Sequence, residues 1–219
     1  MTTLSPETLL LASLGMAVVP LVIAVGSCYL KFSIILSMLR TGFGTQQAPS
    51  ASLVVALSCV MSLVVMQPVL SSIARNASAL SLQEIGDWSI SRLIESGSSV
   101  VLPWKQFLVR HAGERELAVF ASMMGEDRGV SQGVANKEAT PLITALAAFV
   151  LTEIKKGFLI AFFLLLPFFV IDLVVANLLV ALGLTMMSPV VVSLPVKILL
   201  LLSSDGWLLL SHNLIKGYQ

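Results

Sequence analysis

Three charged residues lie in strongly apolar stretches of the sequence, and they are the first candidates for chemistry. Glu153 and Lys197 flank a long run of aliphatic side chains, and Asp172 is the only charged residue between Gly157 and Val196. A charge in such surroundings costs free energy unless it is paired. Asp172 could relay protons, bind a cation, cap a broken helix or form structural hydrogen bonds with neighbouring subunits, and we favour the last role.

Two adjacent methionines form the second candidate site. Met186 and Met187 follow Thr185 in an uncharged segment between two apolar runs. Because a methionine side chain is flexible and polarizable, it repacks around varied shapes. Several copies of such a segment around an axis would make a soft constriction that excludes water and deforms around a passing peptide. The alternative is that both are ordinary core methionines.

Catalytic and metal-binding patterns are absent from the sequence. It contains no P-loop, H-E-x-x-H or G-x-S-x-G motif, so we expect no catalytic residue, no cofactor and no enzyme activity. His111 and His212 are isolated, and we expect no metal site. Cys28 and Cys59 lie in apolar stretches and are interpreted as small buried residues rather than a disulfide.

The composition indicates a membrane protein. Of 219 residues, 57% are hydrophobic and only 11% are charged, and the mean hydropathy is +0.95. Soluble domains carry about 25% charged residues, so this surface must face lipid or other subunits. The net charge of +1 gives no electrostatic basis for binding nucleic acid.

The elements that position the candidate residues are predicted to be helices, and the fold class is all-α. Residues 1–74 are interpreted as an apolar helical hairpin, with uncharged segments at residues 8–30 and 51–73. Residues 75–139 hold seven basic and eight acidic residues and are interpreted as a water-facing helical region. Within it, Glu114–Met124 has the spacing of an amphipathic helix.

Residues 140–219 carry all the candidate residues. We predict a long bent helix to about Leu182, a tight turn over residues 183–189 and one last helix to about Ile215. Asp172 and Asn177 are polar residues within the apolar run. Candidate hinges are the residues that interrupt it, namely Pro167, Gly183, Pro189 and Pro195.

The orientation in the membrane is predicted from few charges. A short loop over residues 31–49 contains Lys31 and Arg40, so the positive-inside rule places it in the cytoplasm and the charged middle region in the periplasm. The first residues carry Glu7 and no base, so no cleaved signal segment is expected.

The second half of the chain resembles a known family. The stretch Pro-Phe-Phe-Val-Ile-Asp at residues 167–172 and the stretch Ser-Leu-Pro-Val-Lys at residues 193–197, followed by Asp205-Gly-Trp, are similar to flagellar FliP and injectisome SctR (YscR, SpaP) proteins. Gly44-Thr-Gln-Gln-Ala-Pro and residues 107–120 also resemble that family. The likeness extends over nearly the whole chain after about residue 15, and the absence of a signal segment favours the injectisome branch.

The resemblance implies an assembly. About five copies would join SctS- and SctT-type subunits in a pore-forming complex of the bacterial inner membrane, next to SctU- and SctV-type subunits and the secretion base ring. Unfolded secreted proteins would pass through it. The family has a gasket loop at the position of Thr185, Met186 and Met187, and in most members this loop contains more methionines than here.

The resemblance also implies a salt bridge between Glu153 and Lys197. A straight hairpin turning near Met187 would place these residues roughly 36 Å apart along the helix. We therefore expect the pair to form between staggered subunits, or through a sharp bend near Pro167. The alternative is that Glu153, close to Lys155 and Lys156, marks a hydrated helix face.

The sequence thus predicts a channel-forming core subunit of a type III secretion export apparatus, which forms a gated entry pore for unfolded proteins. The alternative is a secondary transporter or other ion-coupled membrane carrier, with Asp172 and Glu153 binding the coupled ion at broken helices. No internal repeat is apparent, which disfavours the transporter.

Overall fold

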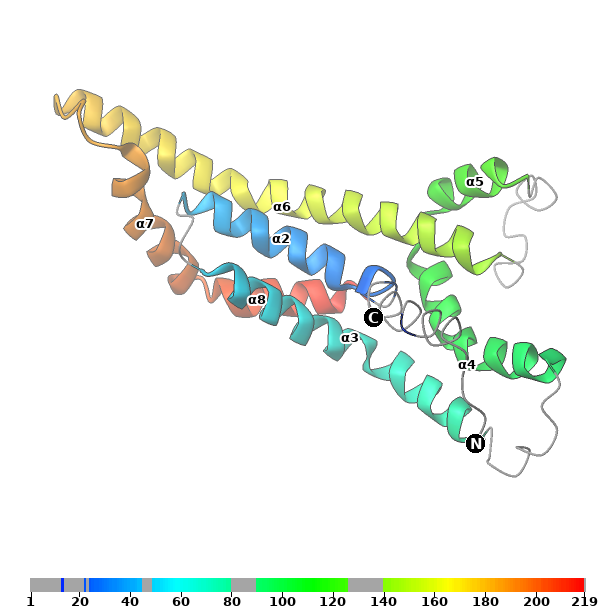
Figure 1. Cartoon of the computed structure of the whole chain (residues 1–219). Coiled ribbons are helices and arrows are strands. Elements are labelled where there is room, and N and C mark those ends of the chain that lie inside the picture. The colour runs from blue at the N-terminus through cyan, green and yellow to red at the C-terminus, as the bar shows by residue number, and fades with distance from the viewer. Residues whose placement is uncertain are drawn as a thin grey trace.

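The structure is a computed structural model that describes residues 13, 22, 24–44, 49–79, 90–125 and 140–218, without the side chains of residues 79 and 90–99. These ranges contain helices and turns and no strand, which confirms the all-α class (Figure 1). The helices are α2 (Tyr29–Gly42), α3 (Ala51–Ala79), α4 (Ile90–His111), α5 (Glu114–Met123), α6 (Leu142–Ala181), α7 (Pro189–Ser203) and α8 (Gly206–Lys216).

Helix α6 is the longest described helix, and most of the others pack on it. Its 40 residues correspond to about 60 Å at helical rise, and α2, α4, α5 and α7 all pack on it (Figure 1). The predicted long helix is confirmed, and it continues through Pro167 without a break. Its end is a Schellman motif: the Leu184 N–H donates to the Leu179 carbonyl and the Gly183 N–H to the Val180 carbonyl. Gly183 has a φ of +73°, which glycine adopts without steric cost.

The prediction of one last helix is wrong, because this segment forms two helices separated by a break. Helices α7 and α8 meet at an angle of 60°. Asp205, between them, has a φ of 47° and is the one non-glycine residue with positive φ in the described ranges. A left-handed residue cannot continue a right-handed helix, so the axis must turn here.

The described part of residues 1–74 is a pair of helices, but its first helix falls on the predicted loop instead of the predicted segment at residues 8–30. Helices α2 and α3 run antiparallel and in contact (Figure 1). Residues 31–42, the first part of the predicted loop, are helical, and Lys31 is only 5% exposed. The loop prediction is wrong because a charge does not by itself end an apolar segment. Most of the predicted segment at residues 8–30 lies outside the described residues.

The middle region packs at one end of α6. Helices α4 and α5 both contact α6, and α5 matches the predicted amphipathic helix to within one residue. The indole N–H of Trp104 donates to the Gly26 carbonyl at 2.8 Å, which ties α4 to the chain just before α2. Residues 126–139 fall outside the described ranges.

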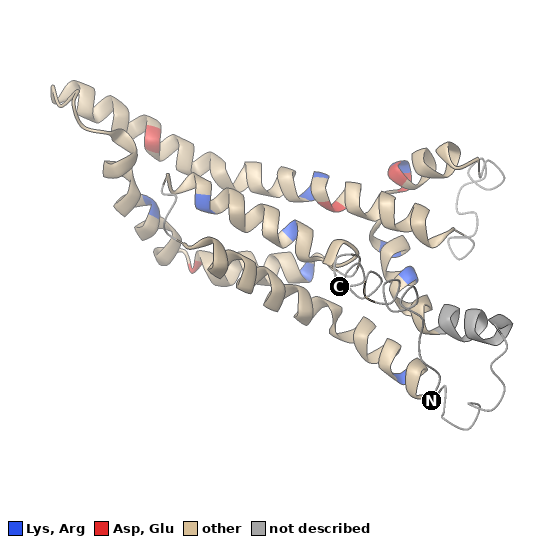
Figure 2. Cartoon of the chain, in the orientation of Figure 1, with Lys and Arg blue, Asp and Glu red and all other residues tan. Residues whose placement is uncertain are grey.

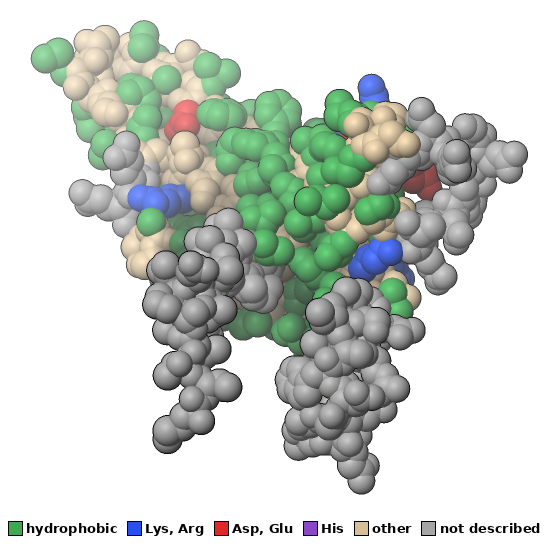
Figure 3. Space-filling view, turned by 45° about the vertical axis from the view of Figure 1, so that its right-hand side comes forward, with side chains coloured by type: hydrophobic (Ala, Val, Ile, Leu, Met, Phe, Trp, Pro, Cys, Tyr) green, Lys and Arg blue, Asp and Glu red, His purple; other side chains and the backbone are tan. Residues whose placement is uncertain are grey.

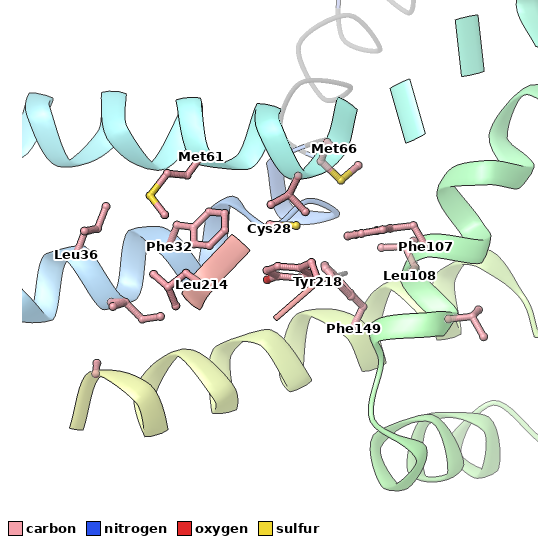
Figure 4. Close-up of a cluster of buried hydrophobic side chains, with 14 of the residues drawn as sticks. Cys28, Phe32, Leu36, Met61, Met66, Phe107, Leu108, Phe149, Leu214 and Tyr218 are labelled. Atoms are coloured by element: carbon pink, nitrogen blue, oxygen red, sulfur yellow. The ribbon is translucent and has the colours of Figure 1, made fainter. Parts of the chain in front are cut away.

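A buried cluster lies where α2, α3, α4, α6 and α8 converge (Figure 4). Phe32, Phe107, Phe149 and Tyr218 contribute its aromatic rings. Small residues on α6 allow the close approach of α2: a Cβ at Gly157 would meet the Ile34 side chain at 3.4 Å, and Ala161 is fully buried. The small residues Gly157 and Ala161 therefore pack against a neighbouring helix.

Two described helices are long and apolar enough to cross a membrane: residues 51–78 within α3 and all of α6. The bent pair of α7 and α8 adds a third candidate span if the two count as one. Charged residues are sparse along these helices (Figure 2), and hydrophobic side chains cover much of the described surface in Figure 3. An apolar surface this extensive needs lipid or protein to cover it.

Candidate functional site

The methionine turn, residues 182–188, lies at the tip of the α6–α7 hairpin, at the opposite end of α6 from α5 (Figure 1). Met186 is 99% exposed and Met187 is 49% exposed. A hydrogen bond from the Met187 N–H to the Leu184 carbonyl at 3.2 Å closes the turn. The alternative that these are core methionines is wrong for the single chain, because neither side chain is buried in it.

The arm that carries this turn makes little contact with the rest of the chain. Every residue from Val180 to Val192 is exposed or half-buried, and Leu182 is 71% exposed. The methionine turn therefore projects as an uncharged tip. Its position depends on where α6 and α7 are held further back.

Lys197 holds α7 to the body of the molecule. Its ammonium group donates to Asp172 Oδ2 at 2.6 Å and to the Gly42 carbonyl at 2.8 Å. The hydroxyl of Ser193, one turn earlier on α7, donates to the other oxygen of Asp172. Lys197 and Ser193 are fully buried, whereas the Asp172 side chain is 29% exposed. We call this set the polar joint; it connects α2, α6 and α7.

Glu153 lies in a second buried polar cluster, in the core near α4. Lys31 Nζ is 3.5 Å from Glu153 Oε2, and the two side chains are 6% and 0% exposed. The Tyr218 hydroxyl donates to the same oxygen, and Lys31 Nζ also lies 3.7 Å from the centroid of the Tyr218 ring. Among the described residues, the Glu153 Oε1 atom has no hydrogen-bond partner.

The predicted pair between Glu153 and Lys197 does not form within the chain, and its formation between staggered copies stays a prediction. Each residue is completely buried and is paired with another residue of its own chain, Lys31 and Asp172 respectively. The physical reason is that a buried charge takes the nearest opposite charge, and the straight-hairpin estimate did not include α2.

Asp172 forms hydrogen bonds within its own chain, to Ser193 and Lys197, and a contact with neighbouring subunits stays a prediction. The helix-cap alternative is wrong, because α6 is unbroken around Asp172. Asn177 is exposed on the same helix. The proposed hinge residues differ in setting: Pro167 and Pro195 lie inside helices, Pro189 begins α7, and Gly183 forms the turn after α6.

A hydrated helix face exists, but without Glu153. Lys155, whose side chain is 68% exposed, donates to Glu116 of α5 at 3.2 Å. Lys156 donates to the His111 carbonyl at 3.3 Å. A backbone hydrogen bond and the Lys155 ammonium group lower the pKa of the Glu116 carboxyl from its ordinary value. The fourth turn of α6 is thus linked to α4 and α5 by polar contacts at the surface.

Sequence reasoning missed three members of these clusters. Lys31 had a usable signal, because it is a single charge between two apolar runs. Ser193 lies four residues before Lys197 and so on the same helix face, which also could have been noticed. Tyr218 carried no signal, since its contacts depend on how α8 returns to the core. The described residues contain no group of three potential metal ligands.

Long apolar helices, buried ion pairs and an exposed apolar tip define an all-α membrane protein. A comparison with protein families matches the FliP family over residues 10–214. The chain belongs to the FliP family.

Individual relatives agree with this assignment. The surface presentation of antigens protein SpaP of Shigella flexneri is 38% identical over 91% of this chain and 90% of its own length. The Yop proteins translocation protein R of Yersinia pestis is 33% identical over 93% and 92%. The flagellar biosynthetic protein FliP of Bacillus subtilis is 33% identical over 98% and 92%. The chain is a component of a type III secretion or flagellar export apparatus, and its SpaP and Yop relatives fit the injectisome branch.

Proposed function

We propose that this chain is a channel-forming core subunit of a type III secretion export apparatus in the bacterial inner membrane. Copies of it line a gated entry pore for unfolded proteins, and their methionine turns form the seal. The proposal rests on one observation: Met186, an apolar residue at the tip of the apolar arm formed by the ends of α6 and α7, is 99% exposed. A side chain of this kind needs an apolar partner, and the described residues of the chain supply none.

The dimensions of α6 support an assembly of copies. At about 60 Å, α6 is roughly twice the 30 Å of a hydrocarbon core. Exposed apolar side chains follow most of its length, from Leu151 to Val180. Lipid can cover only part of that length, so the remainder needs protein. We infer about five sister copies together with SctS- and SctT-type subunits, next to SctU- and SctV-type subunits and the base ring.

The chemistry of the turn suits a deformable seal. Met186 and Met187 are flexible and apolar, and no charged residue lies between Asp172 and Lys197. A ring of such side chains excludes water and ions at rest and repacks around an unfolded chain of any sequence. Gly183 lets the turn reverse sharply, which places both methionines at the tip.

The test is the double substitution Met186→Ala and Met187→Ala in the complex assembled with its partner subunits. We expect small solutes or ions to leak across a membrane that contains the complex, because the constriction loses side-chain volume. The control is Met123→Ala, which removes a 75% exposed methionine from α5, far from the turn. Leak equal to that of the unchanged complex, with assembly intact, contradicts the seal.

The secondary-transporter alternative gains no support from the described residues. Its two proposed ion ligands, Asp172 and Glu153, are both engaged by lysines, and α6 does not unwind near either. The mass of the detergent-purified protein separates the two functions. A transporter is a monomer or a small symmetric oligomer, whereas an export subunit forms a larger ring that recruits other membrane proteins.

A further inference from the structure

Two of the three buried positions of α7 are polar, although Leu194 and Leu201 also pack in an apolar cluster with α2 and α6. The buried residues of α7 are Ser193, Lys197 and Leu201, which are spaced four residues apart on one side of the helix. A helix in an apolar protein is normally held by apolar side chains along such a stripe. Here two of the three positions carry hydrogen-bonding groups, so a few directional contacts decide where α7 lies.

The end of α2 is wedged between α6 and α7 at this polar joint. A Cβ at Gly42 would come within 2.2 Å of the Leu165 side chain, and a Cβ at Gly44 within 2.1 Å of the Val190 side chain. The two glycines thus let the backbone at the end of α2 approach α6 and the backbone just after α2 approach α7. Lys197 then reaches the Gly42 carbonyl and Asp172 together. One ammonium group therefore fixes the positions of three helices relative to one another.

The chain can change direction at both ends of α7. Gly183, with positive φ, begins the turn that precedes α7, and Asp205, in the left-handed region, follows it at the 60° break before α8. Between these points the polar joint supplies the directional contacts with α2 and α6. The Asp172 side chain is 29% exposed, so the chain itself does not fully enclose the carboxylate that Lys197 would leave behind.

We propose that the polar joint controls the seal: while Lys197 contacts Asp172 and Gly42, α7 is held against α2 and the methionine turn stays in its closed position. Release of Lys197 lets α7 pivot between Gly183 and Asp205 and carries the turn away from the pore axis. This inference rests on the proposed function, since it assigns a regulator to the same turn. Lys197 and Asp172 are positioning residues that act through the turn.

The position of α7 is measured directly with spin labels. Cysteines replace Val191 on α7 and Leu53 on α3, which are 69% and 53% exposed, in a chain with Cys59→Ser. The full chain is purified in its complex and diluted with unlabelled chain, so that only distances within one copy are observed. We expect Lys197→Met to broaden or shift the distance distribution, and Lys155→Met, at an exposed ion pair, to leave it unchanged.

The second readout is leak through the assembled complex. A hydrogen bond to a charged group is strong enough that losing it shifts a two-state equilibrium by about tenfold or more, so Lys197→Met should raise leak by at least that factor. Asp172→Asn keeps an acceptor for Ser193 and removes only the charge. It provides the test if Lys197→Met does not accumulate.

Unchanged label distances in both the Lys197 and Asp172 variants overturn the proposal, whatever the leak. A changed label distance without increased solute leak also overturns the proposal, provided that the double variant Met186→Ala with Met187→Ala, in which the polar joint is intact, does increase leak. If that methionine variant does not leak, the proposed seal fails on its own, and the label distances still decide whether the joint positions α7.

Discussion

The buried pair of Lys31 and Glu153 gives the sharpest stability prediction. Lys31→Met keeps the length and apolar stem of the side chain and removes its charge. The carboxylate of Glu153, with 0% side-chain exposure, then keeps Tyr218 as its hydrogen-bond donor and has no cation at 3.5 Å. Breaking one side of a buried pair costs about 3–5 kcal/mol. The lost contact between the ammonium group and the Tyr218 ring adds about 1 kcal/mol.

The double variant Lys31→Met with Glu153→Gln should recover part of that loss. The substituted glutamine side chain is neutral and still accepts the Tyr218 hydrogen bond, so no unpaired charge remains. Replacing both members of a buried pair is often close to neutral, and we expect a net cost of about 1–2 kcal/mol. Glu153→Gln alone leaves the Lys31 ammonium group buried without its carboxylate and should also cost about 3–5 kcal/mol, so the coupling free energy of the double-mutant cycle should be at least about 4 kcal/mol.

The assay is equilibrium unfolding of the detergent-purified chain, followed by the loss of tertiary structure. For a chain of this size, a loss of about 4 kcal/mol lowers the melting temperature by roughly 8–16 °C. Lys155→Met at the exposed ion pair with Glu116 is the matched control, and it should leave the melting temperature nearly unchanged. Single-variant losses that simply add in the double variant would refute the coupling, and so the buried ion pair.

Three further predictions follow from local contacts. Tyr218→Phe should lower the free energy of unfolding by about 1–3 kcal/mol, measured in the same assay, because a buried carboxylate loses its phenol donor. Gly183→Ala should lower the free energy of unfolding by about 1–2 kcal/mol, because of the positive φ alone, since no other atom lies within 4 Å of the added Cβ. Gly44→Ala should lower it by about 2–5 kcal/mol, because the added Cβ also collides with Val190 of α7. Equal losses for the two variants would contradict the packing of the end of α2 between α6 and α7. Because the pKa of Glu116 is lowered, its contribution to stability is present above the ordinary value of 4.5 and is lost as pH falls through the folded-state pKa. A stability–pH curve of Lys155→Met should show a smaller loss in that acid range, and an identical curve would show that the contact is not formed.

Local patterns predicted α3, α5, α6 and the turn after α6 well. The length of α6 and the turn after it follow from a long apolar run that ends in Leu-Gly-Leu, with Pro189 beyond it. Glycine and proline act on their own backbone, so their effect can be interpreted without knowing the fold. The break at Asp205 was missed because aspartate adopts the left-handed conformation only in some contexts.

The charge pairs could not be predicted in the same way. Whether Lys197 meets Asp172 or Glu153 depends on which faces of α2, α6 and α7 come together. Lys31 was assigned to a loop because hydropathy treats every charge as a boundary, although a lysine can lie inside a helix when an acid lies across the interface. The methionine turn was located correctly, since its exposure follows from being the tip of a hairpin.

The length of α6 has a consequence for the biogenesis of the protein. An insertion machinery that recognises about 20 consecutive apolar residues finds several overlapping windows in a 40-residue helix. Hydropathy alone therefore does not fix the depth at which α6 enters the bilayer. Because Glu153 and Asp172 are neutralised by lysines of α2 and α7, the final depth is set only after these helices have docked.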